Sequence, residues 1–213
     1  MYGFLNAEKA LIFRIEHVDN LLWNLQENAL YCRSSGKVNP NYVNIGNSDL
    51  IKARAPHPVP IDPTGTLSDY VPFYFTPFSV MLYNIHTGRS VQKRDNSEIV
   101  FFVSSISRLR ELGLRFVFTN QHAYVAGTEF YSDVSQLDRI DWTILQQRDF
   151  KKTDADPGKG QRYQAEVLVY QSVPMSAILG ICCFNDETKV RIEAMTAAAN
   201  CEVPIHSRPG FYF

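Results

Sequence analysis

Residues 65–88 read GTLSDYVPFYFTPFSVMLYNIHTG, and aromatic residues crowd the centre of this stretch. Aromatic and β-branched residues favour strands, but Pro72 and Pro77 interrupt the run. Because proline has no backbone N–H to donate, we do not expect one long central strand here. Six aromatic residues most simply fill a core, with a base-stacking surface as the alternative: Tyr70, Phe73, Tyr74, Phe75, Phe78 and Tyr83.

Short apolar runs on either side of this stretch predict further strands. They lie at residues 10–17, 98–103, 115–119, 165–170 and 177–184, and CEVPIH at 201–206 is typical of an edge strand. Helical spacing predicts helices at 17–30, 104–113 and 186–200, and more weakly at 132–145. Asp19 and Asp186 are the expected caps of the first and last of these helices. Because strands and helices mix without a regular β-α-β rhythm, an α+β fold is favoured.

Residues 33–70 form about 38 residues of Gly-, Pro-, Asn- and Ser-rich sequence. Compact domains rarely contain so long an irregular stretch unless it works as a lid or binding loop. A solvated insertion is the alternative.

Length and composition limit the number of domains, the cellular setting and the kinds of ligand that are expected. A chain of 213 residues with 45% hydrophobic content is expected to fold as one domain. Its net charge of −1 means that any nucleic-acid contact must be local. Four cysteines without a CxxC pair fit a reducing, cytoplasmic setting. Neither a signal peptide nor an apolar run long enough for a membrane is evident. The five histidines are scattered, so no metal site is expected, and no phosphate-binding glycine motif occurs.

Glu166 stands near the start of a predicted strand, within QRYQAEVLVYQSVP at residues 161–174. A polar residue on one face of a half-exposed strand is ordinary. A catalytic carboxylate fixed on a rigid element is the alternative. The pattern alone favours the ordinary interpretation, and the same holds for Arg54 on its loop and for His122 after the strand at 115–119.

Six blocks in order resemble the DarT family, whose members are toxins that transfer ADP-ribose from NAD onto bases of single-stranded DNA. The resemblance runs from about residue 11 to the C-terminus, and residues 65–88 are its most specific part. The other blocks are HVDNL (17–21), FVFTNQHA (116–123), LDRIDW (137–142), RYQAEVLV (162–169) and RPGFYF (208–213).

The resemblance implies a fold and a set of elements. It implies an ADP-ribosyltransferase-like split, mainly antiparallel β-sheet core flanked by helices, in a single domain over residues 1–213. Residues 38–56 would be the NAD-binding element, and the region 118–166 the substrate-recognition loop. NAD would be consumed as co-substrate, without a metal.

The resemblance also implies roles for single residues. Glu166 matches the catalytic glutamate, and Arg54 matches an arginine that contacts NAD and assists deprotonation of the base. Further NAD contacts are expected from Arg14, Ile15, Glu16, Trp23 and Tyr31, and substrate contacts from Met81 and His122. This chain departs from the family at Arg14 and Glu16, where histidine and threonine are common, so the details of NAD binding and the target base stay open there.

Basic and aromatic residues in and after the loop before Glu166 suit contact with single-stranded DNA. A solvated charged loop is the alternative. The residues are Arg148, Lys151, Lys152, Lys159, Arg162 and Tyr163.

The expected activity is a glycosyltransferase reaction that moves ADP-ribose from NAD to thymidine or guanosine in single-stranded DNA and blocks replication. Transfer to protein, NAD hydrolysis in the same cleft and non-catalytic nucleic-acid binding are the alternatives. The resemblance implies a partner as well, a DarG-type macrodomain antitoxin that removes ADP-ribose from DNA. No membrane association is expected.

Overall fold

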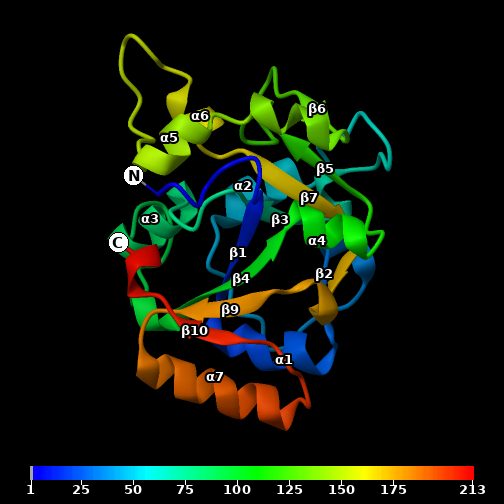
Figure 1. The fold of residues 1–213 in the computed structure, drawn as a ribbon, viewed down its shortest axis with the longest axis vertical. Coiled ribbons are helices and arrows are strands. Elements are labelled where there is room, and N and C mark those ends of the chain that lie inside the picture. The colour runs from blue at the N-terminus through cyan, green and yellow to red at the C-terminus, as the bar shows by residue number, and fades with distance from the viewer. Residues whose placement is uncertain (1) are drawn as a thin grey trace.

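The computed structural model describes residues 2–213. Within these residues an eight-stranded sheet has the order β10-β9-β4-β1-β3-β7-β5-β6, and β2 and β8 form a second, two-stranded sheet (Figure 1). All pairs are antiparallel except β9 and β10. The strands are β1 Leu11–His17, β2 Ala29–Tyr31, β3 Tyr70–Tyr74, β4 Ile99–Ser105, β5 Phe116–Thr119, β6 Phe130–Tyr131, β7 Glu166–Tyr170, β8 Ser172–Pro174, β9 Gly180–Cys183 and β10 Ile205–Ser207.

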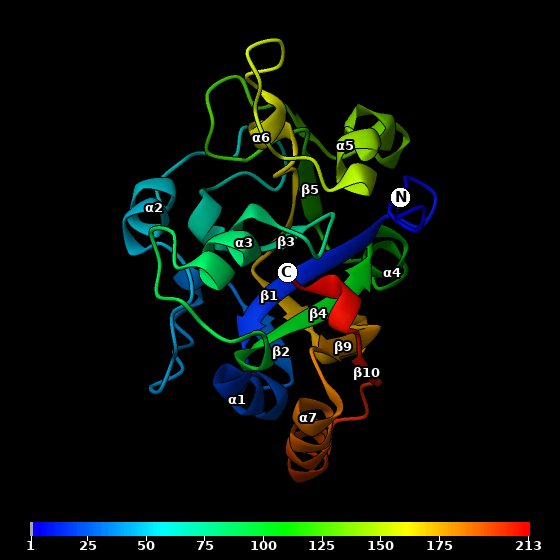
Figure 2. The same cartoon turned by 90° about the vertical axis from the view of Figure 1, so that its left-hand side faces the viewer.

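The helices cover the sheet at its two ends and along one side. Figure 2 shows α2 and α3 beside β1 and β3, with α5 and α6 at the top and α1 and α7 at the bottom. Their bounds are α1 Leu21–Gln26, α2 Ser48–Arg54, α3 Val80–Thr87, α4 Ile106–Glu111, α5 Trp142–Gln147, α6 Lys159–Arg162 and α7 Asp186–Ala198. Across residues 2–213, no helix has the length and apolar character that a membrane crossing requires.

The large sheet is split between β1 and β3. Seven residue pairs join β1 to β4, whereas β1 meets β3 at the single pair of Phe13 and Tyr74. Arg14 Nη1 reaches across this gap and donates to the Pro72 carbonyl oxygen at 3.3 Å. The backbone N and C=O of one strand residue point to the same side, so the missing N–H of Pro72 also faces the gap. A proline is therefore tolerated near the middle of the sheet.

The stretch 65–88 forms the short strand β3 followed by the helix α3. The absence of one long strand is confirmed, whereas α3 was not predicted. Ser79 caps α3 by accepting from the Leu82 backbone N–H at 3.1 Å, and Gly88 ends it with a φ of 76°. The aromatic residues of this stretch are mostly core: Tyr70, Phe73, Phe75 and Phe78 are at most 2% exposed. Tyr74 is only half-buried and lies near Glu166.

Two predicted helix caps are wrong by one or two positions. His17, and not Asp19, accepts from a backbone N–H at the start of the first helical turn. Asn185, and not Asp186, caps α7 by accepting from the Thr188 N–H at 2.8 Å. An N-cap residue needs an extended backbone so that its side chain can reach back, and Asn185 has φ −141° and ψ 173°.

The long stretch 33–70 is ordered and contains α2, which its composition concealed. Asn47 caps α2 by accepting from the N–H groups of Asp49 and Leu50. Further upstream the Asn20 side chain clamps Val43, accepting from its N–H at 2.8 Å and donating to its carbonyl at 2.9 Å. The stretch is thus fixed to the domain and carries Arg54 to the sheet.

Candidate active site

Glu166 begins β7 and is completely buried. Its Oε2 accepts from Arg54 Nη2 at 2.6 Å, across 112 positions of the chain, and its Oε1 accepts from the Ala123 N–H at 3.0 Å. His122 Nε2 lies 4.0 Å from the same Oε1. Since β7 is paired on both sides, with β3 and with β5, the carboxylate stands on a rigid element.

The turn after β5 delivers His122 and Ala123 to this carboxylate. Thr119, the last residue of β5, donates its hydroxyl to the Gln121 carbonyl at 2.6 Å and accepts from the Glu166 N–H at 3.1 Å. The His122 N–H donates to the Gln161 carbonyl at 3.0 Å. These bonds tie the turn to the segment before β7, so that both residues have fixed positions.

The charges at this point favour an ionised glutamate. Burial acts to raise the pKa of Glu166, but the Arg54 charge, His122 and the hydrogen bonds outweigh it and hold the pKa below its ordinary value. Burial acts to lower the pKa of Arg54, yet the Glu166 carboxylate raises it on balance. The pKa of His122 is lowered, first by burial and also by Arg54, against the pull of Glu166. Burial and Glu166 raise the pKa of Tyr74 to about 12, so its hydroxyl stays neutral.

A cavity of about 240 Å³ opens above this group. It is bounded by β1, β2, the segment 42–55, β3, α3 and the turn at His122, and Arg54 lies in its wall. Six residues that the sequence predicted for the site line it together: Arg14, Ile15, Tyr31, Arg54, Met81 and His122. The family resemblance implied that residues 38–56 bind NAD, and residues of this segment form much of the wall.

Two further predicted residues lie behind the wall. Glu16 is buried, and its Oε1 accepts from the Asn20 side chain at 2.8 Å while its Oε2 accepts from Arg14 Nη2 at 3.4 Å. Trp23 packs edge-on against Tyr31, with 6.2 Å between ring centroids. Both side chains therefore support residues that line the cavity.

Arg14 is incompletely paired. Its Nη1 and Nη2 have partners, but its Nε is buried and has no hydrogen-bond partner within residues 2–213. A buried donor without a partner costs about 1–3 kcal/mol. This side chain is therefore suited to receive an acceptor from a molecule in the cavity.

The residues predicted for DNA contact lie outside the cavity lining. Arg148 stacks over the Phe78 ring at 3.8 Å, and Tyr163 is 1% exposed. Lys159 Nζ donates to Asp149 at 2.6 Å. Arg162 binds both Asp156 and Asp141. Lys159 and Arg162 are thus paired with nearby aspartates, whereas Arg148 and Tyr163 pack against aromatic rings. Contact of these four side chains with DNA stays a prediction.

Some residues of the site escaped the sequence interpretation. Tyr74 lies directly opposite Glu166 in the register of β3 and β7, and Gln164 and Tyr42 line the cavity. Gln164 could have been predicted as a site residue from its position two residues before Glu166. Ala123 contributes through its backbone, for which its residue type gives no signal.

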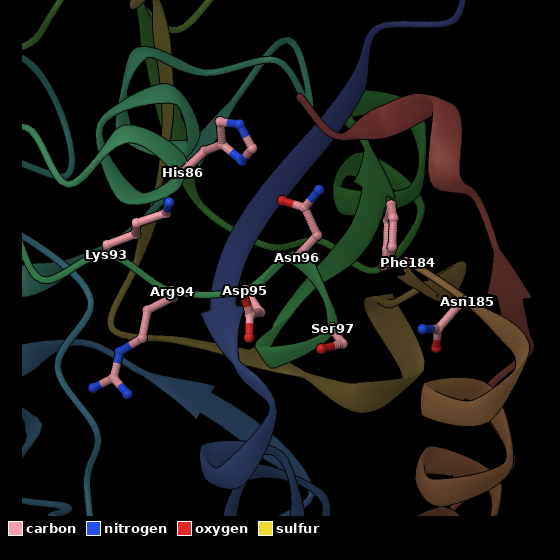
Figure 3. A pocket seen from close by; sticks show the side chains of 8 residues that line it. All are labelled: His86, Lys93, Arg94, Asp95, Asn96, Ser97, Phe184 and Asn185. Atoms are coloured by element: carbon pink, nitrogen blue, oxygen red, sulfur yellow. The ribbon is translucent and has the colours of Figure 1, made fainter.

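A second hollow of about 370 Å³ shares no lining residue with this cavity. Figure 3 shows His86, the loop at Lys93–Ser97, and Phe184 and Asn185 around it. A buried ion pair of the Glu166–Arg54 kind does not occur among its eight lining residues. Within residues 2–213, no group of His, Cys, Asp or Glu side chains is arranged to hold a metal ion. The cavity lined by Arg54 and His122, with Glu166 bound behind them, is therefore the candidate active site.

Residues 13–213 match the family model described as DarT, ssDNA thymidine ADP-ribosyltransferase. The chain belongs to the DarT family. A DNA ADP-ribosyl transferase of Escherichia coli O127:H6 (strain E2348/69 / EPEC) is 48% identical over 210 residues, which cover 98% of this chain and 96% of the relative.

Solved DarT structures agree with the fold. Thermus sp. 2.9 DarT in complex with ADP-ribosylated ssDNA has a TM-score of 0.90 at 28% identity, covering 97% of both chains. The same protein in complex with NAD+ has a TM-score of 0.83 at 28% identity, covering 97% of this chain and 98% of the other. Thermosipho africanus DarTG in complex with ADP-ribose, at 17% identity and a TM-score of 0.74, shares the fold over 95% of this chain and 51% of its own. The expected α+β fold with a mostly antiparallel, split sheet is confirmed.

Proposed function

We propose that this protein uses Glu166 and Arg54 to transfer ADP-ribose from NAD to a thymidine base of single-stranded DNA, releasing nicotinamide. Membership of the DarT family and 48% identity to a DNA ADP-ribosyl transferase make it an NAD-dependent enzyme acting on single-stranded DNA. One observation carries the assignment of residues: a fully buried glutamate lies 2.6 Å from an arginine in the wall of a cavity.

The chemistry explains why a carboxylate belongs there. As the bond between C1″ of the ribose and the nicotinamide nitrogen breaks, its electron pair neutralises the pyridinium and positive charge develops at C1″. Glu166 stabilises that charge and accepts a hydrogen bond from a ribose hydroxyl, as carboxylates do in glycoside cleavage. A carboxylate can do so only when ionised, which its lowered pKa provides.

The base nitrogen then bonds to C1″ and loses a proton. Arg54 is not the base in this step, because its pKa is raised still further by Glu166. We assign the proton to Glu166, while the Arg54 guanidinium orients the base and stabilises the negative charge that develops on it. A base on the Watson–Crick edge is free to react only when unpaired, which agrees with a single-stranded substrate.

NAD would occupy the cavity lined by Arg14, Ile15 and Tyr31, with residues 38–56 over it. Arg14 would use its unpaired Nε to bind a carbonyl or phosphate oxygen, while Glu16 holds the guanidinium and Trp23 holds Tyr31. Arg14 offers donors where the family's histidine can also accept, so its role is to bind and not to move a proton.

Thymidine is the proposed acceptor because the matching family model is described for thymidine. Guanosine is the second candidate, since Arg14 lines the cavity and departs from the family pattern. Met81 and His122, which line the cavity beside Arg54, are proposed to contact the base.

The biological role follows from the chemistry. An ADP-ribosylated base cannot pair, so we propose that the protein is a toxin that blocks DNA replication in the cytoplasm. Its neutralising partner would be a macrodomain antitoxin that removes ADP-ribose from DNA. Support for such a partner comes from the shared fold with Thermosipho africanus DarTG in complex with ADP-ribose.

The deciding experiment incubates the protein with labelled NAD and single-stranded oligonucleotides that contain thymidine or guanosine as the only modifiable base. Label should appear on thymidine-containing DNA and disappear with Glu166→Gln, which keeps the shape and removes the charge. Glu111→Gln, at an exposed glutamate on α4, is the matched control. Label on guanosine alone would refute the thymidine acceptor, and undiminished label with Glu166→Gln would refute the catalytic assignment.

A further inference from the structure

An exposed pair of aromatic rings lies beside the Glu166 group. Tyr124 is 37% exposed, although tyrosine has a large apolar ring. The partly exposed His57 ring meets it edge-on, with 5.4 Å between the centroids and 77° between the planes. An edge-on contact leaves a ring face open. Neither residue lines the cavity assigned to NAD.

The Tyr124 backbone is held in place. Its N–H donates to His122 Nδ1 at 3.3 Å, and the Val125 N–H donates to the His122 carbonyl at 3.0 Å. The Thr128 hydroxyl, shared with the Val125 carbonyl, also donates to the His122 carbonyl at 2.9 Å. An aromatic ring on a fixed turn loses little further freedom when it binds a ligand.

The pair connects the two segments that bind the catalytic carboxylate. Ala123, whose N–H is 3.0 Å from Glu166 Oε1, directly precedes Tyr124. Arg54, at 2.6 Å from Oε2, precedes His57 by three positions. Any base that reacts beside Glu166 therefore has its neighbour in the strand close to these rings.

We propose that Tyr124, supported by His57, stacks on the nucleobase next to the acceptor and so positions single-stranded DNA for transfer. The proposal rests on the proposed function of the Glu166 site. Every base presents an aromatic face, and its stacking on an aromatic side chain does not require a fixed sequence. DNA held in this way needs few cationic contacts, in keeping with a net charge of −1.

The test measures the effect of a protein variant and of a missing DNA base, each alone and both together. Oligonucleotides with one acceptor carry either a natural base or an abasic site at each neighbouring position, and KM for DNA is measured with the wild type and with Tyr124→Ala. One abasic position should raise the wild-type KM by roughly 5- to 150-fold, the range for loss of one stacked base. Tyr124→Ala should show the same loss on the natural oligonucleotide and no further loss on the abasic one. Tyr124→Phe should behave as the wild type.

Other measurements separate stacking on DNA from a merely structural contact between His57, which follows α2, and the turn that carries Tyr124. The affinity of Tyr124→Ala for NAD, measured by calorimetry, should equal that of the wild type. Leu179→Ala, at an exposed leucine that is absent from the cavity wall, is the control for both readouts. The proposal would be overturned if Tyr124→Ala and the abasic site each raised KM for DNA and their effects multiplied when combined. Weakened NAD binding by Tyr124→Ala would also overturn it. A wild type that modifies no DNA would overturn the proposed function itself, and this proposal with it.

Discussion

At the scale of single residues, the Glu166–Arg54 pair both stabilises the fold and carries the proposed catalytic roles. Breaking a buried ion pair by removing one partner typically costs about 3–5 kcal/mol because the other charge stays buried. Arg54 is 16% exposed at its side chain and Glu166 1%. A variant that keeps both charges therefore separates chemistry from folding better than an alanine variant does.

Arg54→Lys is such a variant. Lysine keeps the positive charge beside Glu166 but lacks the planar fork of donors that we assign to orienting the base. We expect kcat for DNA modification to fall about 100-fold or more, as on removal of one donor aimed at developing charge. The melting temperature should change little, and Arg54→Gln, which removes the charge, should lower it clearly. Full DNA modification by Arg54→Lys would contradict the orienting role.

The lowered pKa of His122 predicts a pH dependence of stability. Burial comes first among its causes, so the folded state binds a proton at His122 less readily than the unfolded chain does. The stabilisation is complete above the ordinary pKa of 6.5 and is lost as the pH falls below it toward the folded pKa. His122→Gln should therefore flatten the fall in melting temperature on acidification from about pH 7 to 5. An unchanged slope would show that His122 does not titrate in this environment.

At the scale of elements, the Asn20 side chain holds the first half of the segment 38–56 in place. Asn20 makes both hydrogen bonds to the Val43 backbone and also donates to Glu16. Asn20→Ala leaves these buried groups without partners, at a cost of about 1–3 kcal/mol. We expect a lower melting temperature and a raised KM for NAD, because Val43 is no longer held against the turn that follows β1. Asn39→Ala, which removes one local turn contact in the same segment, is the control and should leave KM unchanged.

Helices and strands could be predicted from the sequence where a local pattern of apolar residues marks them. Apolar runs located β1, β4, β5, β7 and β9, because a strand buried on a sheet needs consecutive apolar residues. The helix α2 was missed because its residues Ser48–Arg54 bury no side chain completely and so show no apolar face. Strand order is a property of tertiary packing, and the chain pattern alone gave no sign that β1 and β3 separate at Pro72.

Sequence patterns predicted less of the candidate site than of the fold. Glu166 and Arg54 are 112 positions apart, and each is ordinary in its own surroundings. Only the family resemblance joined them, and the structure then brought six predicted residues into one cavity. The resemblance could not supply partners that belong to this chain alone, such as the contact between Arg14 and Glu16. Nor could composition reveal that Lys159 and Arg162, two of the five cations predicted for DNA contact, are paired with nearby aspartates.

At the scale of the whole molecule, a net charge of −1 leaves DNA binding to a few local cations. In the loop before α6, Asp149 and Asp156 are paired with Lys159 and Arg162 of α6. Lys151 and Lys152 in the same loop are exposed and form no ion pair within residues 2–213. These two lysines are therefore the loop cations that can bind phosphate without first breaking an existing contact.

Salt dependence can test this distinction. Each phosphate contact to a single strand contributes about −0.7 to the slope of log affinity against log salt concentration. Lys151→Gln/Lys152→Gln should thus flatten the slope for single-stranded DNA by up to about 1.4 without changing the melting temperature. Arg162→Gln should instead lower the melting temperature, since it breaks the pairs that hold the loop. The control is Lys189→Gln on α7, at the opposite end of the molecule (Figure 1). An unchanged slope in the double variant would exclude these lysines from the path of the DNA and leave stacking as the principal contact.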